Sequence, residues 1–189
     1  MSLATLWYGT YGIWIGSEIW IAIATRTRNS TGTVRDRGTM RLLWIVLFTT
    51  ITAGIWISQS VESNLAGGAP WLRPTSLLVL IAGLVLRWSA VLALGKSFSS
   101  NVAIHATQKV LKTGLYRWMR HPSYTGLLLC IFAVALHTRN WISMLIIVPP
   151  CFAAVCYRIY VEEMALHEHF GEEYVSYSRE TKRLVPGIY

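Results

Sequence analysis

Residues 75–94 read TSLLVLIAGLVLRWSAVLAL, a run whose one charged side chain is Arg87. A helix that crosses the hydrocarbon core of a membrane needs about 20 predominantly apolar residues, so this run predicts a membrane-spanning helix. Similar stretches occupy residues 6–24, 42–58, 124–136 and 141–161. The chain is therefore predicted to be an all-α integral membrane protein with about five transmembrane helices, forming one domain over residues 1–189.

The composition agrees with this fold class. Hydrophobic residues make up 53% of the chain and charged residues only 14%, whereas soluble domains carry about 25% charged residues. The mean hydropathy is +0.43, and the nine Trp and nine Tyr are typical of membrane interfaces. These values exclude a disordered chain, an ordinary soluble nucleic-acid binder and a disulfide-stapled module. The three cysteines lie in apolar stretches and are expected to be free thiols. The N-terminus lacks the basic region of a cleavable signal peptide.

The basic residues predict the orientation of the spans. Fourteen of the 17 Lys and Arg lie in residues 25–41, residues 95–122 and the tail that starts at Arg158, and the alternate connections hold only Arg73 and Arg139. Cytoplasmic segments carry the excess of positive charge. We therefore expect the N-terminus outside and the C-terminus in the cytosol. A cytosolic catalytic loop, about residues 96–126, and a C-terminal helical tail, about residues 158–186, are expected to form the active surface.

The first segment with candidate functional residues is GLYRWMRHPSYTG, residues 114–126. Pro122 is suited to the first turn of a helix and disfavours a helical backbone at His121. Free backbone donors at such a helix start, with Arg120, His121 and Tyr124 around them, predict a site for a carboxylate or phosphate. The alternative is an ordinary interfacial helix start whose basic residues meet lipid headgroups.

The second segment begins where the fifth span should leave the membrane. Arg158 and Glu162 are four residues apart and share a helix face, which alone is consistent with a simple intrahelical ion pair. The order Arg then Glu is the poorer one for helix stability, which favours a separate partner for each.

Four residues inside the predicted spans are also candidates for a specific role. Arg87 and Glu18 are expected to face the bundle interior or an aqueous cavity, with snorkelling as the alternative for Arg87. Gly12 lies four residues before Gly16, a spacing typical of close helix packing.

Two other kinds of site receive no support from the sequence. The five histidines show no metal-ligand spacing, so no metal is expected. No GxGxxG follows a strand, which argues against a Rossmann-type nucleotide site.

Taken together, the two segments resemble the isoprenylcysteine carboxyl methyltransferase family, membrane enzymes that use S-adenosylmethionine without a Rossmann domain. The resemblance covers residues 83–186, and its elements come in the family's order. They are Gly83 to Phe98, Gly114-x-Tyr116, Arg120-His-Pro-Ser-Tyr-Thr-Gly126, Arg158-x-x-x-Glu162-Glu163, Phe170-Gly171-x-x-Tyr174-x-x-Tyr177 and Pro186. Residues 36–39 also resemble an element of bacterial members, and a bacterial inner membrane is the expected location.

The resemblance implies roles for particular residues. Arg158 would bind the carboxylate of the substrate, and the catalytic group would be Arg158, Glu162 and Glu163. The cofactor S-adenosylmethionine would be bound by His105, Gln108, Lys109, Val110, Leu111, Tyr116, His121, Pro122, Ser123, Tyr124 and Glu162. The substrate would be a lipophilic small molecule or prenylated peptide that enters from the lipid bilayer, with no nucleic acid as partner.

The chemistry of these residues is consistent with that reading. A C-terminal carboxylate, with a pKa of about 3.5, is ionised at neutral pH and needs no general base to attack a methyl sulfonium. The enzyme must position and desolvate it, which Arg158 and a water-poor pocket can do.

Other functions remain open at this stage. A phospholipid N-methyltransferase or a thiol S-methyltransferase would use a similar cofactor site, but its acceptor must lose a proton, so its activity should rise with pH. The non-enzymatic alternative is a small transporter or membrane scaffold. Transporters are expected to show repeats or broken midplane helices, whereas this chain concentrates its polar groups at one face.

Overall fold

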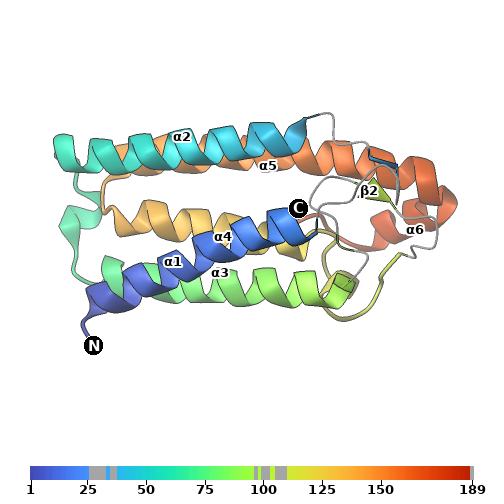
Figure 1. Ribbon diagram of the computed structural model, residues 1–189, viewed down its shortest axis with the longest axis horizontal. Coiled ribbons are helices and arrows are strands. Elements are labelled where there is room, and N and C mark those ends of the chain that lie inside the picture. The colour runs from blue at the N-terminus through green and yellow to red at the C-terminus, as the bar shows by residue number, and fades with distance from the viewer. Residues whose placement is uncertain (26–32, 35–37, 96–97, 99–102, 105–109, 188–189) are drawn as a thin grey trace.

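The structure is a computed structural model that describes residues 1–25, 33–34, 38–95, 98, 103–104 and 110–187, and these residues are mostly helical. The long helices lie alongside one another, and a short helix near the C-terminus lies beyond one end of them (Figure 1). In chain order the elements are α1 (Leu3–Ala24), β1 (Thr33–Val34), α2 (Thr39–Ser60), η1 (Leu65–Gly68), α3 (Leu72–Leu94), β2 (Ala103–Ile104), η3 (Gly114–Arg117), α4 (Pro122–His137), α5 (Trp141–Phe170) and α6 (Glu172–Glu180).

The predicted all-α membrane fold is confirmed. Within the described part of the chain, α2, α3 and α5 are long and apolar enough to cross a membrane, and α4 is a shorter apolar helix. Each of the five apolar stretches falls inside one of the long helices, although five crossings remain a prediction. Helix α5 extends nine residues beyond the predicted span and ends at Phe170, just before Gly171, which has φ 55°. Its 30 residues correspond to about 45 Å, more than the roughly 30 Å of a hydrocarbon core.

Glycines allow α3 and α4 to approach closely. A Cβ at Gly126 would lie 2.6 Å from the backbone nitrogen of Arg87, and one at Gly83 would lie 2.9 Å from the carbonyl oxygen of Gly126. Small residues at helix interfaces let backbones meet in this way. The close packing predicted for Gly12 and Gly16 is wrong within the described residues, because a Cβ at either position would have no described neighbour within 4 Å.

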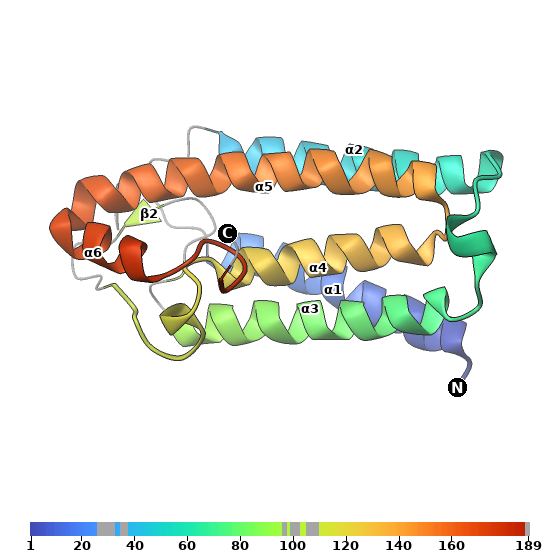
Figure 2. The ribbon, with the colours of Figure 1, turned by 180° about the vertical axis from the view of Figure 1, so that it is seen from behind.

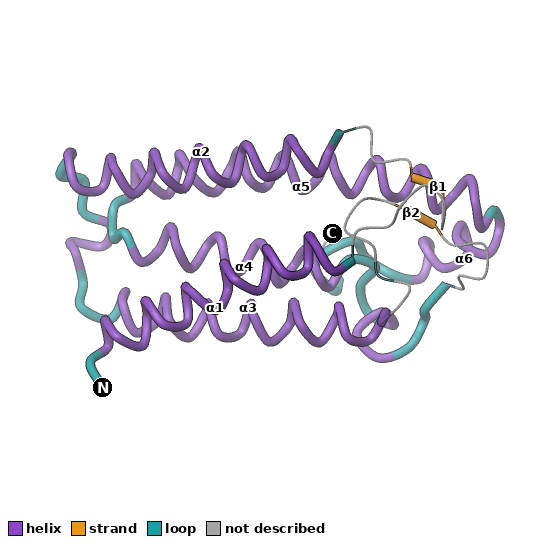
Figure 3. The backbone as a smooth tube through the Cα atoms, viewed as in Figure 1, coloured by secondary structure: helices purple, strands orange, loops and turns teal. Residues whose placement is uncertain are grey.

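The connections gather at the two ends of the bundle. At the end that holds the N-terminus (Figure 2), the N–H of Leu65 donates to the carbonyl of Arg139 at 2.7 Å, and the Asn140 side chain donates to Val61 at 2.7 Å. These bonds join the α2–α3 and α4–α5 connections. At the other end β1 pairs antiparallel with β2, close to α6 (Figure 3). The α1–α2 and α3–α4 connections therefore meet beside the C-terminal tail.

Candidate active site

The start of α4 lies against the part of the C-terminal tail that follows α6, residues 181–187. Pro122 is the first residue of α4, and His121 before it has a non-helical backbone (φ −124°, ψ 54°). The N–H groups of Arg120 and His121 donate to the carbonyls of Lys182 and Arg183 at 2.8 and 2.9 Å. These two N–H groups lie just before the helix start, and the tail occupies them; the free donors were predicted for the helix start itself.

Three basic side chains converge on Glu163 of α5. Arg120 Nε donates to Oε1 at 2.8 Å, Arg183 Nε donates to Oε2 at 2.8 Å, and His121 Nε2 lies 3.3 Å from Oε1. Arg120 also donates to the carbonyls of Ser178 in α6 and of Thr181 directly after it. Both oxygens of Glu163 are thus engaged, and this carboxylate joins α4, α5 and the tail. Its predicted catalytic role stays a prediction.

The hydroxyl of Tyr124 connects Arg158 with Glu162. It accepts a hydrogen bond from Arg158 Nε at 2.8 Å and donates to Glu162 Oε2 at 2.8 Å. Arg158 is only 2% exposed and also donates to the hydroxyl of Thr39, at the start of α2, at 2.9 Å. The expectation that Arg158 and Glu162 each have a partner besides the other is met. Neighbouring Glu162 and Glu163, which sequence could not tell apart, have different partners.

Buried tyrosines connect η3 to α6. The Tyr177 hydroxyl donates to the carbonyl of Tyr116 at 2.6 Å, and the Tyr116 hydroxyl donates to the carbonyl of Ala90 in α3 at 3.2 Å. Burial raises the pKa of Tyr177 to about 12, so the hydroxyl remains a donor at neutral pH. The buried hydroxyl of Tyr174 has no hydrogen-bond partner among the described residues. Burial also raises the pKa of Tyr174, which leaves an unused donor beside the site.

The structure describes only some of the other residues expected at the cofactor site. Pro122 and Ser123 are buried at the start of α4, and Val110 and Leu111 are half-buried ahead of η3. The remaining predicted residues lie outside the described part of the chain: His105, Gln108 and Lys109, together with residues 36–37 of the bacterial-type element.

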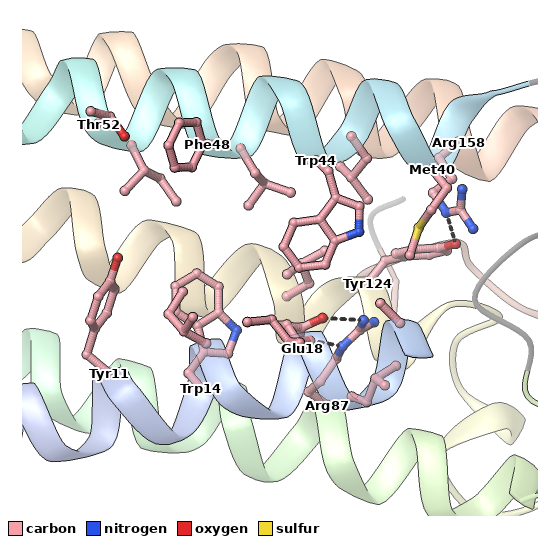
Figure 4. A pocket seen from close by; sticks show the side chains of 18 of the residues that line it. Tyr11, Trp14, Glu18, Met40, Trp44, Phe48, Thr52, Arg87, Tyr124 and Arg158 are labelled. Atoms are coloured by element: carbon pink, nitrogen blue, oxygen red, sulfur yellow. Dashed lines mark hydrogen bonds and ion pairs between the residues drawn. The ribbon is translucent and has the colours of Figure 1, made fainter. Parts of the chain in front are cut away.

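An apolar cavity of about 480 Å³ lies between α1 and α2 and ends at polar side chains. Figure 4 shows Trp44 and Phe48 of α2 facing Trp14 of α1 across it, with Arg158 and Tyr124 at the end nearest the active surface. The indole N–H of Trp14 is buried there without a hydrogen-bond partner among the described residues. The sequence analysis did not predict that α2 lines a cavity at this site. The one feature that pointed to this region was the resemblance at residues 36–39.

Glu18 and Arg87 form an ion pair in the cavity wall. Arg87 Nε donates to Oε1 of Glu18 at 2.9 Å and Nη2 donates to Oε2 at 2.8 Å. The third nitrogen of Arg87, Nη1, donates to the carbonyl and hydroxyl of Ser123. The predicted interior position is correct for both residues, and the snorkelling alternative for Arg87 is wrong. The pairing itself was not predicted.

Comparisons with known proteins agree on one family. Residues 76–168 match the model of the isoprenylcysteine carboxyl methyltransferase family. Protein-S-isoprenylcysteine O-methyltransferase B of Arabidopsis thaliana is 32% identical over 125 residues, covering 62% of this chain and 61% of the relative. The protein-S-isoprenylcysteine O-methyltransferase of Tribolium castaneum is 31% identical over 154 residues, covering 75% of this chain and 52% of that relative.

A solved structure has a similar fold. The structure of a eukaryotic intramembrane Ras methyltransferase, isoprenylcysteine carboxyl methyltransferase, superposes with a TM-score of 0.60 at 26% identity. The match covers 75% of this chain and 52% of that one. The chain thus spans between half and two thirds of the length of these similar proteins.

Proposed function

Because the chain belongs, through residues 76–168, to the isoprenylcysteine carboxyl methyltransferase family, we propose that it is a membrane methyltransferase that uses S-adenosylmethionine. Its acceptor is the carboxylate of an isoprenylcysteine-like or other lipophilic molecule. Residues 1–189 form one methyltransferase domain, whose catalytic region comprises about residues 96–126 and 158–186.

One observation carries this proposal: the apolar cavity ends at Arg158. Its wall along α2 runs from Met40 to Ile55, a separation of fifteen residue steps or about 22 Å at 1.5 Å per residue. A long hydrocarbon chain fits such a space, and a guanidinium at its end is the preferred partner of a carboxylate. Arg158 is therefore the substrate-binding residue, held in orientation by Tyr124 and Thr39.

The described residues suit the proposed cofactor. The buried Tyr174 hydroxyl is a donor without a partner among the described residues, and the Glu162 carboxylate is a partner for an ammonium or ribose group. The proposed cofactor-binding set is His105, Gln108, Lys109, Val110, Leu111, Tyr116, His121, Pro122, Ser123, Tyr124 and Glu162; the first three of these are included on the resemblance alone.

The residues then have distinct tasks. S-adenosylmethionine, when bound, would supply an electrophilic methyl group to the acceptor carboxylate and would leave as the neutral thioether. Arg158 orients the carboxylate and Glu162 orients the cofactor, while Tyr124 fixes the two side chains relative to each other. The apolar walls exclude water from the carboxylate, which raises its nucleophilicity. No general base is required, because the carboxylate is already ionised.

The membrane orientation follows from the distribution of charge. The helix ends that flank the basic connections lie at the α6 end of the bundle, and the N-terminus lies at the opposite end. We assign the α6 end to the cytosol and the N-terminus to the outside, in a bacterial inner membrane. The polar cofactor then arrives from the cytosol, and the lipophilic acceptor enters the cavity from the bilayer.

The test is methyl transfer by the detergent-purified protein from labelled S-adenosylmethionine to N-acetyl-S-farnesylcysteine. The methyl amide of the same acceptor is the matched control, because it keeps the prenyl chain and lacks the carboxylate. We expect a base-labile methyl ester from the acid, nothing from the amide, and a rate nearly constant with pH through neutrality. Methylation of phosphatidylethanolamine or of an alkanethiol instead, at a rate rising with pH, would overturn the carboxylate assignment. A folded protein that binds no S-adenosylhomocysteine would overturn the methyltransferase assignment.

A further inference from the structure

Two arginines line the same cavity and face its polar end from different helices. Arg158 comes from α5 and Arg87 from α3, as Figure 4 shows. Arg158 donates to the hydroxyls of Tyr124 and Thr39. Arg87 binds a carboxylate, with two nitrogens on the two oxygens of Glu18.

Two guanidinium groups create a problem for an acceptor that carries one carboxylate. In a water-poor cavity, a carboxylate pairs strongly with any guanidinium whose charge is not compensated. Binding to Arg87 would place the acceptor on α3 and away from the junction of Arg158, Tyr124 and Glu162. Such a complex would be unproductive, because displacement at a methyl group requires the nucleophile in line.

The geometry of Glu18 prevents this outcome. Its carboxylate matches the Nε and Nη2 edge of Arg87 at 2.9 and 2.8 Å, and Glu18 and Arg87 are only 7% and 6% exposed. The third nitrogen of Arg87 is directed to Ser123, the residue before Tyr124. All three guanidinium nitrogens therefore have an acceptor supplied by the protein itself.

We propose that Glu18 is a specificity-determining residue of the acceptor site: as the fixed counter-ion of Arg87, it keeps the acceptor carboxylate off α3 and directs it to Arg158. This role rests on the proposed function, since it concerns a lipophilic carboxylate in the same cavity. Its position supports it, because the pair lies in the cavity wall. Stability alone gives little reason for the pair, since well-packed apolar residues of similar volume often stabilise a protein as much as a buried ion pair does.

The kinetic test is Glu18→Gln, which keeps the shape of the side chain and removes its charge. Arg87 remains a cation, because guanidinium groups stay protonated in proteins. Acceptor molecules then bind unproductively to Arg87, so kcat and KM for the acceptor should fall together by about tenfold with kcat/KM nearly unchanged. A purely structural role predicts a lower kcat/KM, and that result would overturn the proposal.

A binding test separates this proposal from the proposed function, since it needs no turnover. Dodecanoate and dodecanamide are titrated into the wild type and Glu18→Gln without cofactor. We expect dodecanoate to bind Glu18→Gln about tenfold more tightly than the wild type, and dodecanamide to bind both equally. The double variant Glu18→Met/Arg87→Met removes the counter-ion together with the competing cation, so the gain should disappear, and persistence of the gain would contradict the proposal.

The double variant also keeps the proposal testable if Glu18→Gln folds poorly, because the double variant leaves no buried charge unpaired. In that case dodecanoate should bind the double variant no more tightly than the wild type. Tighter binding would show that Arg87 is not the competing site. If the wild type methylates no carboxylate while the binding pattern holds, the proposed function fails and the masking of Arg87 stands.

Discussion

Replacing Tyr124 by phenylalanine removes one oxygen atom and leaves the aromatic ring in place. That oxygen accepts a hydrogen bond from Arg158 and donates one to Glu162, each at 2.8 Å. The substitution therefore removes the hydroxyl that joins the proposed carboxylate-binding residue to the proposed cofactor-binding residue, while most of the packing around α4 is preserved.

The size of the effect can be worked from these two bonds. A hydrogen bond to a charged group contributes about 1.5–3 kcal/mol. Both bonds exist before substrate binds, so their loss affects turnover only through the orientation of Arg158 and Glu162. Taking the equivalent of one bond as the lost orientation energy, kcat/KM should fall roughly 10- to 150-fold.

The assay compares initial rates of methyl ester formation by Tyr124→Phe and Tyr160→Phe. Tyr160 lies on the same helix as Arg158, but its side chain is 56% exposed on the outside of the bundle. The control should keep the wild-type rate, and thermal melts should report a folded protein in both cases. A Tyr124→Phe enzyme within twofold of the control in kcat/KM would refute the reasoning.

Four further substitutions test other parts of the site and fold, and Gly12→Ala serves as a control. Arg158→Ala should bind S-adenosylhomocysteine like the wild type and lose turnover, whereas Glu162→Ala should weaken that binding by about tenfold or more; calorimetry with both variants decides, and equal losses of affinity would contradict the division of roles. Gly126→Ala drives a Cβ into the α3 backbone and should destabilise the protein by about 1–3 kcal/mol, while Gly12→Ala should be neutral in the same thermal melt. Glu163→Gln leaves basic side chains without their counter-ion, so limited proteolysis should release the C-terminal tail faster than in the wild type, and an unchanged rate would argue against the anchoring role.

Much of the fold could be predicted because the membrane imposes a one-dimensional constraint. The thickness of the hydrocarbon core fixes the length of an apolar helix, so the run at residues 75–94 is readable without knowledge of its neighbours. The glycines show where this kind of reading ends. Spacing indicates that Gly12 and Gly16 share one side of α1, but it does not say whether another helix lies opposite, and α3 and α4 meet at Gly83 and Gly126 instead.

The site could be predicted in residue types but not in pairings. Spacing placed Arg158 and Glu162 on one face of a helix, yet the group that joins them, Tyr124, lies 34 residues before Arg158 in the sequence. The need to compensate buried charge indicated an interior position for Glu18 and Arg87 without identifying either as the other's partner. Such contacts depend on how whole helices are arranged, which local sequence does not encode.

The spacing of the functional residues along helix α5 limits which insertions and deletions this protein can tolerate. Successive residues of a helix point about 100° apart, so Glu162 reaches Tyr124 while Glu163 reaches the tail, and Arg158 on the same rod reaches the cavity. A single-residue insertion or deletion between residues 158 and 163 would turn one set of these partners away from the other. Loops elsewhere can lengthen or shorten over evolutionary time, but this stretch of α5 must be inherited, or transplanted into a chimaera, without any change in length.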